Sequence, residues 1–316
     1  MVVYVDGHEV RKCPQSTAEL FSKHAGLVSR ASEWRQTGST LVPEAGSLYV
    51  AQREFAIVRA GDNRVAMVGS DDATTCHVLV FHNRQTGAVA VAHFDGGKNE
   101  KIAIHYMVQT ILESGAATII DVYAIGGFYR KLSEVKGTKE SHKLSLKLLS
   151  VCIDLDCKFN IVQWCCCEQN SRVVSEPKDY IVPYFFGLCW DRKKGVANPA
   201  VFASQGPDAI LKAASRWSSS KHMLNRYNDL NHSITIQPFR GFSNSGDWHN
   251  YRNFTDEQIL KYFSTSPSAE PPHFASRMRE MFSLFADHPN PTQTLFTHGK
   301  PKVYVLEQTG LWEFVN

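Results

Sequence analysis

The chain has 316 residues, of which 43% are hydrophobic and 21% are charged, and its formal net charge is +3. This composition is typical of a protein with a folded core, and the length suits one large domain or two ordinary ones. The weak charge argues against nucleic acid as a partner, because binding to a phosphate backbone requires a concentrated basic patch.

The ends and the cysteines predict the cellular setting. The N-terminus lacks the basic and apolar segments of a secretory signal, and no stretch approaches the roughly 18 apolar residues of a membrane helix. The eight cysteines include no CxxC pair, and the consecutive Cys165, Cys166 and Cys167 would point alternately to opposite faces of a strand. We expect reduced cysteines in a cytoplasmic or nuclear protein that has no membrane contact, no cofactor and no metal.

The first third of the chain predicts a strand at 2–5 and a helix over about 17–35 that begins after Ser16. Further strand-like segments follow at 48–58, 64–68, 77–81 and 89–93. The short turns between these segments favour antiparallel hairpins rather than helical crossovers.

The remainder alternates helices and strands. Helices are predicted around 104–112, 144–155 and 207–216 and after Pro271-Pro272, and strands at 118–125, 159–167, 181–190, 233–238, 303–306 and 311–314. The segment 217–253 is rich in Ser, Asn, His and Gly and resembles a loop-rich insertion. We therefore expect one α+β domain over 1–316, with antiparallel β-sheets packed with flanking helices.

Cys76 is the main candidate for catalysis. The small and polar residues that precede it leave room for a substrate and supply donors for an oxyanion. The next strand-like run ends at His93, whose imidazole is available as a base for the thiol. Ser70 lies shortly before Cys76 and can accept the imidazole N–H as a third member of the site. The alternative is a small core cysteine at the start of a strand.

Other chemistries are less well supported. His77, His82, His93 and Asp95 include the residue types of a zinc site, but His77 and His82 would face opposite ways on one strand. The sequence contains neither a GxxxxGK[ST] nor a GxGxxG phosphate loop, and no GxSxG nucleophile elbow.

Acidic residues flank the candidate cysteine. Asp71 and Asp72 either bind a cationic group of a substrate, such as a free amine, or form an ordinary acidic turn. Asp95 either orients His93 or begins the turn at 95–97.

Two long motifs are specific to one family. The run GSDDATTCH at 69–77 and the run STSPSAEPPHF at 264–274 closely resemble the protein N-terminal asparagine amidohydrolases, and shorter matches continue in order over 288–313. The resemblance is strong over about 45–97 and 263–313 and loose between them.

The resemblance implies an enzyme that hydrolyses the side-chain amide of N-terminal asparagine in proteins and peptides, giving N-terminal aspartate and ammonia. In the N-degron pathway that aspartate is then arginylated and the protein is degraded. Cys76 matches the nucleophile of this family. The backbone around Thr75 is then expected to hold the oxyanion, and Asp71, Asp72, Asp95 and Glu270 are the candidates for binding the substrate α-amine.

The spacing of Ser70, Cys76 and His93 is also similar to that of the bacterial chemoreceptor deamidases, which share a sandwich fold with the cytotoxic necrotizing factor deamidases. This similarity implies an α/β/β/α sandwich. Alternatives to the amidohydrolase are a non-catalytic N-degron binding module, a cysteine deamidase that accepts both Asn and Gln, and a cysteine protease or transglutaminase-like enzyme.

Overall fold

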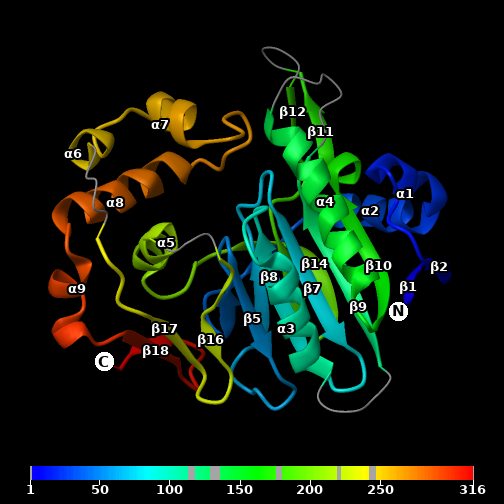
Figure 1. Ribbon diagram of the computed structural model, residues 1–316, viewed down its shortest axis with the longest axis horizontal. Helices are drawn as coiled ribbons and strands as arrows, with labels where there is room; N and C mark the ends of the chain where they lie inside the picture. The colour runs from blue at the N-terminus through cyan, green and yellow to red at the C-terminus, as the bar shows by residue number, and fades with distance from the viewer. Residues whose placement is uncertain are drawn as a thin grey trace.

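The structure is a computed structural model that describes residues 2–112, 118–128, 136–175, 180–218, 222–241 and 247–315 (Figure 1). The helices in this part of the chain are α1 (Thr17–Lys23), α2 (Ala25–Thr37), α3 (Glu100–Leu112), α4 (Lys136–Asp154), α5 (Ala209–Ser218), α6 (Trp248–Tyr251), α7 (Asp256–Phe263), α8 (Phe274–Asp287) and α9 (Pro291–Thr294). None of them combines the length and the apolar character that crossing a bilayer would require.

The largest sheet, called here the large sheet, has the strand order β15-β5-β8-β7-β9-β10-β1-β2 among the described residues. These strands are β1 (Val2–Val5), β2 (His8–Val10), β5 (Glu54–Val58), β7 (His77–Asn83), β8 (Val89–Phe94), β9 (Ile119–Gly126), β10 (Lys158–Cys166) and β15 (Leu224–Asn225). The central strands β5, β8, β7 and β9 pair antiparallel, whereas β9, β10 and β1 run parallel.

A second sheet packs against the large one and has the order β3-β14-β13-β6-β4. Its strands are β3 (Thr40–Val42), β4 (Ser47–Tyr49), β6 (Met67–Ser70), β13 (Leu188–Asp191) and β14 (Val196–Phe202). Two smaller sheets join β11 (Ser171–Val174) to β12 (Tyr180–Pro183), and β16 (Tyr227–Asn228) to β17 (Ser233–Ile236), β18 (Lys302–Leu306) and β19 (Trp312–Phe314).

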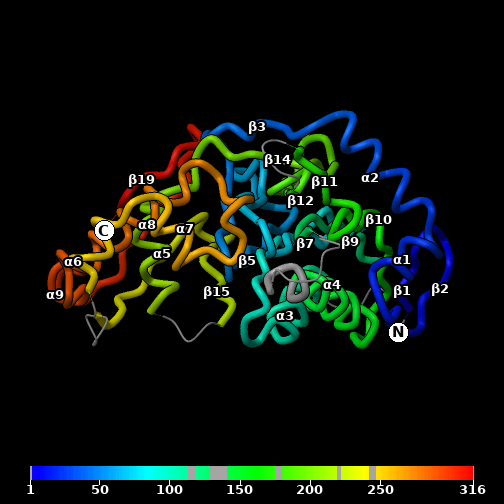
Figure 2. The backbone as a smooth tube through the Cα atoms, turned by 90° about the horizontal axis from the view of Figure 1, so that it is seen from above, coloured from blue at the N-terminus to red at the C-terminus, as the bar shows by residue number. Residues whose placement is uncertain are grey.

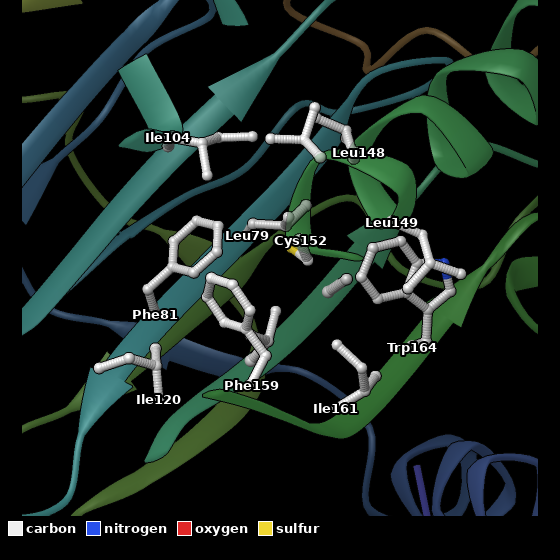
Figure 3. Packing of buried hydrophobic residues seen from close by; sticks show 14 of the residues in the cluster. Leu79, Phe81, Ile104, Ile120, Leu148, Leu149, Cys152, Phe159, Ile161 and Trp164 are labelled. Atoms are coloured by element: carbon white, nitrogen blue, oxygen red, sulfur yellow. The ribbon is translucent and has the colours of Figure 1, made fainter. Parts of the chain in front are cut away.

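Side chains along β7 point alternately to the two faces of the large sheet, and this explains why both faces are covered. Leu79 and Phe81 point to the helical side and pack with Ile104 of α3 and Leu148 of α4 (Figure 3). Val78 and Val80 point the other way, into a core shared with the second sheet. Figure 2 shows α3 and α4 on one side of the large sheet and β3 and β14 on the other.

A third apolar cluster lies beside these layers. Helices α5, α6, α7 and α8 pack on one another through buried residues that include Leu211, Ile259 and Phe282. Both views place this group at the β5 edge of the large sheet rather than over the second sheet (Figures 1 and 2).

The α+β class is confirmed, but two details differ from the expectation. The large sheet is mixed, because α4 forms a helical crossover between β9 and β10, and such a connection joins parallel strands. The layer order in the described chain is helices, sheet, sheet, with the remaining helices at the side, so the expected fourth layer of an α/β/β/α sandwich is displaced to the edge.

Several predicted segments are divided. The helix expected over 17–35 is two helices separated at His24, and the strands expected at 48–58 and 181–190 are each two strands. In the segment 217–253, the described residues add β15 to the large sheet and β17 to a smaller one. Residues 219–221 and 242–246 of that segment lie outside the described residues.

Gly126 allows β9 to approach the backbone just before β7. Its φ is 142°, and a Cβ added there would lie 2.2 Å from the carbonyl oxygen of Cys76. We predict that Gly126→Ala lowers the free energy of unfolding by about 3 kcal/mol or more, because it combines an unfavourable φ with a backbone clash. Chemical denaturation measures this loss.

Gly87 is the matched control. It also has a positive φ, 75°, but an added Cβ would meet no atom within 4 Å. Gly87→Ala should cost only about 1–2 kcal/mol, the ordinary penalty of the left-handed conformation. Equal losses in the two variants would show that the close approach at Gly126 does not matter.

Candidate active site

Ser70 and His93 meet between the two main sheets. Ser70 is the last residue of β6 in the second sheet, and His93 lies near the end of β8 in the large sheet. Both side chains are buried, and the Ser70 Oγ lies 2.7 Å from the His93 Nδ1. The structure thus brings together two of the three residues expected to form the catalytic group.

The direction of this hydrogen bond follows from its surroundings. The Ser70 hydroxyl can donate to the carbonyl oxygen of Asp71, 3.5 Å away, which leaves the Ser70 Oγ free to accept the Nδ1–H of His93. The proton on Nδ1 leaves a lone pair on Nε2, which is buried and has no hydrogen-bond partner in the described chain. An unpaired buried acceptor of this kind suits a base that takes its proton from a reacting group.

Cys76 is half-buried immediately before β7 and lines the same cavity as His93. Its backbone is fixed from both sides. Ser141 Oγ donates to the carbonyl oxygen of Thr75 at 2.9 Å, and the Gly127 N–H donates to the carbonyl oxygen of Cys76 at 2.8 Å.

These two contacts also orient a donor. In a trans peptide the N–H points opposite to the C=O of the same unit, so Ser141 turns the N–H of Cys76 away from α4. No protein acceptor in the described part of the chain takes the N–H of Thr75 or Cys76. Both N–H groups therefore remain available for an oxyanion beside the thiol.

The thiol and the imidazole are both neutral at rest. Burial raises the pKa of the Cys76 thiol well above its usual range, and the nearby carboxylates of Asp95 and Glu270 raise it further. Burial lowers the pKa of His93 to about 4, and the Arg216 cation adds to this effect. These shifts favour a neutral thiol and a neutral imidazole over a thiolate–imidazolium pair.

A group of cations surrounds one buried carboxylate behind His93. Glu54 lies 3.2 Å from Arg226 and 3.4 Å from Arg216, and Lys212 is buried nearby. Burial lowers the pKa of Lys212 to about 8, although the Glu54 carboxylate favours its charged form. Within this group, Arg216 lowers the pKa of His93, whereas the Glu54 carboxylate raises it.

The cavity beside Cys76 has a volume of about 430 Å³. Its walls come from the ends of the sheets, from α5 and from α8 with the preceding loop. The cavity thus lies where the layered core meets the lateral helices.

Asp71 and Asp72 bind protein groups. The Asp71 Oδ1 accepts from the Tyr49 hydroxyl at 2.9 Å and its Oδ2 from the Phe202 N–H at 2.6 Å, and burial raises the pKa of this carboxyl to about 6. The Asp72 Oδ2 contacts the side chains of Gln205, His273 and Arg277 at 2.8–2.9 Å. Asp71 therefore stabilises the second sheet, and Asp72 connects the loop between β6 and β7 to the start of α8.

Asp95 and Glu270 differ in what neutralises them. Asp95 lies 3.3 Å from the Arg53 guanidinium and accepts from the Gln52 amide at 3.0 Å. Glu270 contacts the hydroxyls of Ser264 and Ser266 through Oε1, at 2.5 and 3.2 Å. Its Oε2 has no partner, and no cation pairs with it, among the described residues.

The histidines of the zinc alternative do not come together. His77 contacts Gly127 on the helical side of the large sheet, whereas His82 stacks on Trp190 on the other side, with ring centroids 4.2 Å apart. The described residues contain no cluster of three or more metal-ligating side chains.

The two motifs singled out in the sequence lie side by side. The Ser266 hydroxyl donates to the Thr74 hydroxyl at 2.9 Å, and Thr265 approaches Thr75 at 3.5 Å. A family model described as protein N-terminal asparagine amidohydrolase matches residues 37–314. The chain belongs to this family.

Relatives that carry this family's name align over all or most of the chain. Human protein N-terminal asparagine amidohydrolase is 32% identical over 100% of this chain and 99% of its own length, and the mouse protein of the same name is 33% identical over the same shares. A protein of that name from Arabidopsis thaliana is 28% identical over 84% of this chain and 80% of its own length.

Some site residues were not identified from the sequence. Ser141 lies far from the motif and carried no signal of its own, and Glu54, Lys212 and Arg216 act only through three-dimensional proximity. The Gly126-Gly127 pair does carry a signal, since adjacent glycines after an apolar strand indicate a close backbone approach.

We predict that the His93 imidazole is neutral at pH 6 and carries its proton on Nδ1, because burial lowers its pKa to about 4. Nitrogen-15 NMR of the ring distinguishes the two tautomers and follows the titration. Ser70→Ala should remove the preference for the Nδ1–H form, because the acceptor is lost. A cationic ring at pH 6, or an Nε2–H form in the unsubstituted protein, would contradict this assignment.

Proposed function

We propose that the protein hydrolyses the side-chain amide of N-terminal asparagine in proteins and peptides, with Cys76 as the nucleophile. The observation that carries this proposal is the buried Ser70–His93 hydrogen bond, which leaves the imidazole Nε2 without a partner in the described chain while His93 and Cys76 line the same cavity. Family membership supplies the substrate class.

The first half-reaction forms a thioester. His93 Nε2 takes the proton of the Cys76 thiol as the sulfur attacks the carboxamide carbon of the asparagine side chain. The backbone N–H groups of Thr75 and Cys76 stabilise the oxyanion. His93 then gives its proton to the departing nitrogen, so that ammonia leaves and an acyl-enzyme remains.

The second half-reaction regenerates the thiol. His93 takes a proton from water as the water oxygen attacks the thioester carbon. Collapse of this intermediate breaks the carbon–sulfur bond, and the thiolate recovers the proton from His93. The product is N-terminal aspartate.

Glu270 is the carboxylate that we assign to the substrate α-ammonium. Two serines hold its Oε1, its Oε2 is unpartnered in the described chain, and it is close enough to raise the pKa of Cys76. Asp71, Asp72 and Asp95 already contact protein donors or cations, which reduces their attraction for a further ammonium.

We place this activity in the N-degron pathway, in the cytoplasm or nucleus, where the new N-terminal aspartate becomes a substrate of the arginylation machinery. The eight cysteines are all free thiols, and this supports a reducing compartment.

Cys76→Ser should lose nearly all activity while it keeps the fold, because a serine hydroxyl is a far poorer nucleophile beside a neutral imidazole. Mass spectrometry of a short Asn-initiated peptide measures the reaction as a gain of about one dalton without chain cleavage. Peptides with an acetylated N-terminus, an N-terminal Gln or an internal Asn are the substrate controls.

The variant control is Cys13→Ser, a half-buried thiol outside the cavity, which should remain active. Substantial turnover by Cys76→Ser would overturn the assignment of the nucleophile. Binding of Asn peptides without release of ammonia would instead favour the N-degron binding module, and gain of mass on the Gln peptide would favour the broader deamidase.

Glu270→Gln should lower the kcat/KM for the Asn peptide by an amount that corresponds to about 2–5 kcal/mol in the activation free energy, because the ammonium loses a desolvated counter-ion. The same change should reduce the difference in kcat/KM between peptides with a free N-terminus and peptides with an acetylated N-terminus. Glu280→Gln, an exposed carboxylate on α8 outside the cavity, is the matched control. If the difference in kcat/KM between free and acetylated peptides is unchanged in Glu270→Gln, another carboxylate binds the α-amine.

A further inference from the structure

The backbone of Cys76 is held by two hydrogen bonds, one on each side of its Cα. The carbonyl oxygens of Thr75 and Cys76 belong to the two flanking peptide units, and they accept from the Ser141 hydroxyl and the Gly127 N–H. When both flanking peptide planes are fixed, the φ and ψ of Cys76 are fixed, and so is the direction of its Cα–Cβ bond. The direction of the thiol therefore depends on how firmly Ser141 and Gly127 are held.

Asn170 holds Gly127. It ends the short 3-10 turn Cys167–Asn170 and is fully buried. Its Nδ2 donates to the carbonyl oxygens of Gly127 and Phe185 at 3.0 and 2.9 Å, and its Oδ1 accepts from the Phe185 N–H at 2.9 Å. The two ends of the amide are distinguished by these contacts, because an exchanged amide would place a donor against the Phe185 N–H. One side chain thus joins two backbone segments.

The second of these segments supports the loop between β6 and β7, residues 71–76. The carbonyl oxygen of Phe186 accepts from the N–H of Ala73 at 2.8 Å. The residue before Ala73 in this loop, Asp72, has a φ of 57°, a conformation that is unfavourable for a residue with a side chain and needs support from its surroundings. The Asn170 amide is therefore connected to the loop at two points, at Ala73 and at Cys76.

A side-chain amide suits these backbone groups better than other residue types. The Gly127 carbonyl and both Phe185 groups have no other hydrogen-bond partner among the described residues, and both residues are buried. An apolar side chain at position 170 would leave all three groups unpaired. A carboxylate would supply no donor and would place a negative charge against two carbonyl oxygens.

Asn170 is remote from the reacting groups. It is not one of the described residues that line the cavity, so its effect on the reaction must pass through the backbone of the loop. The turn that contains it also reaches the other support of Cys76, because the Cys167 Sγ lies 3.8 Å from the carbonyl oxygen of Ser141. The turn Cys167–Asn170 thus contacts both residues that hold the backbone of Cys76.

We propose that Asn170 is a positioning residue for the reaction, and that its amide fixes the backbone at Ala73 and Cys76 and thereby the direction of the thiol. This inference deepens the proposed function and rests on Cys76 as the nucleophile. Such a residue affects the rate of the chemical step more than the binding of the peptide, because a small displacement of a reacting atom raises the barrier.

Asn83 provides a matched control. It is also fully buried, and it lies at the end of β7 opposite to Cys76. Its Nδ2 donates to the carbonyl oxygen of Ile111 at 2.8 Å, and its Oδ1 accepts from the Gln85 N–H at 2.9 Å. Asn83→Ala and Asn170→Ala therefore remove similar sets of buried hydrogen bonds, but only Asn170→Ala removes the support of the loop.

The first experiment measures the kinetics on an Asn-initiated peptide, expressed per folded molecule. Asn170→Ala should lower kcat about 10- to 100-fold, as expected for a misplaced nucleophile. Its KM should change by less than about 3-fold, because the residue lies outside the cavity. Asn83→Ala should keep both constants within about 3-fold of those of the unsubstituted protein. An unchanged kcat in folded Asn170→Ala, or an equal loss in Asn83→Ala, would overturn the proposal.

The second experiment measures hydrogen exchange and does not depend on activity. The amide hydrogens of Ala73 and Gly127 should exchange about 10-fold faster or more in Asn170→Ala, relative to the rest of the protein, because the loop opens locally. Asn83→Ala should leave these relative rates unchanged. If Asn170→Ala does not fold, Asn170→Asp replaces it in both experiments, since it keeps the shape of the side chain and lacks both donors when ionised.

The two experiments separate this inference from the proposed function. If the unsubstituted protein releases no ammonia from the peptide, the proposed function is overturned, and hydrogen exchange alone then decides the role of Asn170. Faster exchange at Ala73 and Gly127 would support the role of Asn170 in holding the loop, and unchanged exchange would overturn it.

Discussion

One hydrogen bond, between Ser70 Oγ and His93 Nδ1, determines the geometry of the candidate site. It joins the two sheets at the edge of a largely apolar core, and both of its partners are buried. The packing of the sheets fixes the distance, and the hydrogen bond in turn fixes the ring and its tautomer. The position of Cys76 in the same cavity depends on separate contacts from Ser141 and Gly127.

The charge distribution favours a thiol that is inactive until a substrate arrives. Burial opposes the thiolate and the imidazolium alike, and the Arg216 cation opposes the imidazolium further. A substrate ammonium that neutralises Glu270 would remove one of the negative charges that hold the thiol protonated. Under the proposed assignment of Glu270, binding of the N-terminus and deprotonation of Cys76 would be electrostatically linked.

The candidate catalytic residues could be picked out from the sequence because Ser70, Cys76 and His93 lie within a short stretch of chain, and the structure brings Ser70 and His93 into contact. The antiparallel hairpins around them followed from short turns, but the parallel pairing of β9 and β10 did not, because it depends on how α4 packs. The sequence could not rank the carboxylates as candidates for binding the α-amine, because they differ in the protein groups that each one contacts. Asp71 meets Tyr49 and Phe202, whereas Glu270 keeps a free oxygen.

Helix α8 has its own apolar cluster, and its first turn contacts Asp72 through the polar side chains of His273 and Arg277. Substitutions on the open face of α5 or α8 can thus accumulate without disturbing the packing of the sheets. Over evolutionary time, the range of accepted N-termini is free to diverge among species while the reaction itself stays constant. The same separation makes the cavity-lining side chains of α5 and α8 a natural target for engineering an amidohydrolase with altered sequence preference.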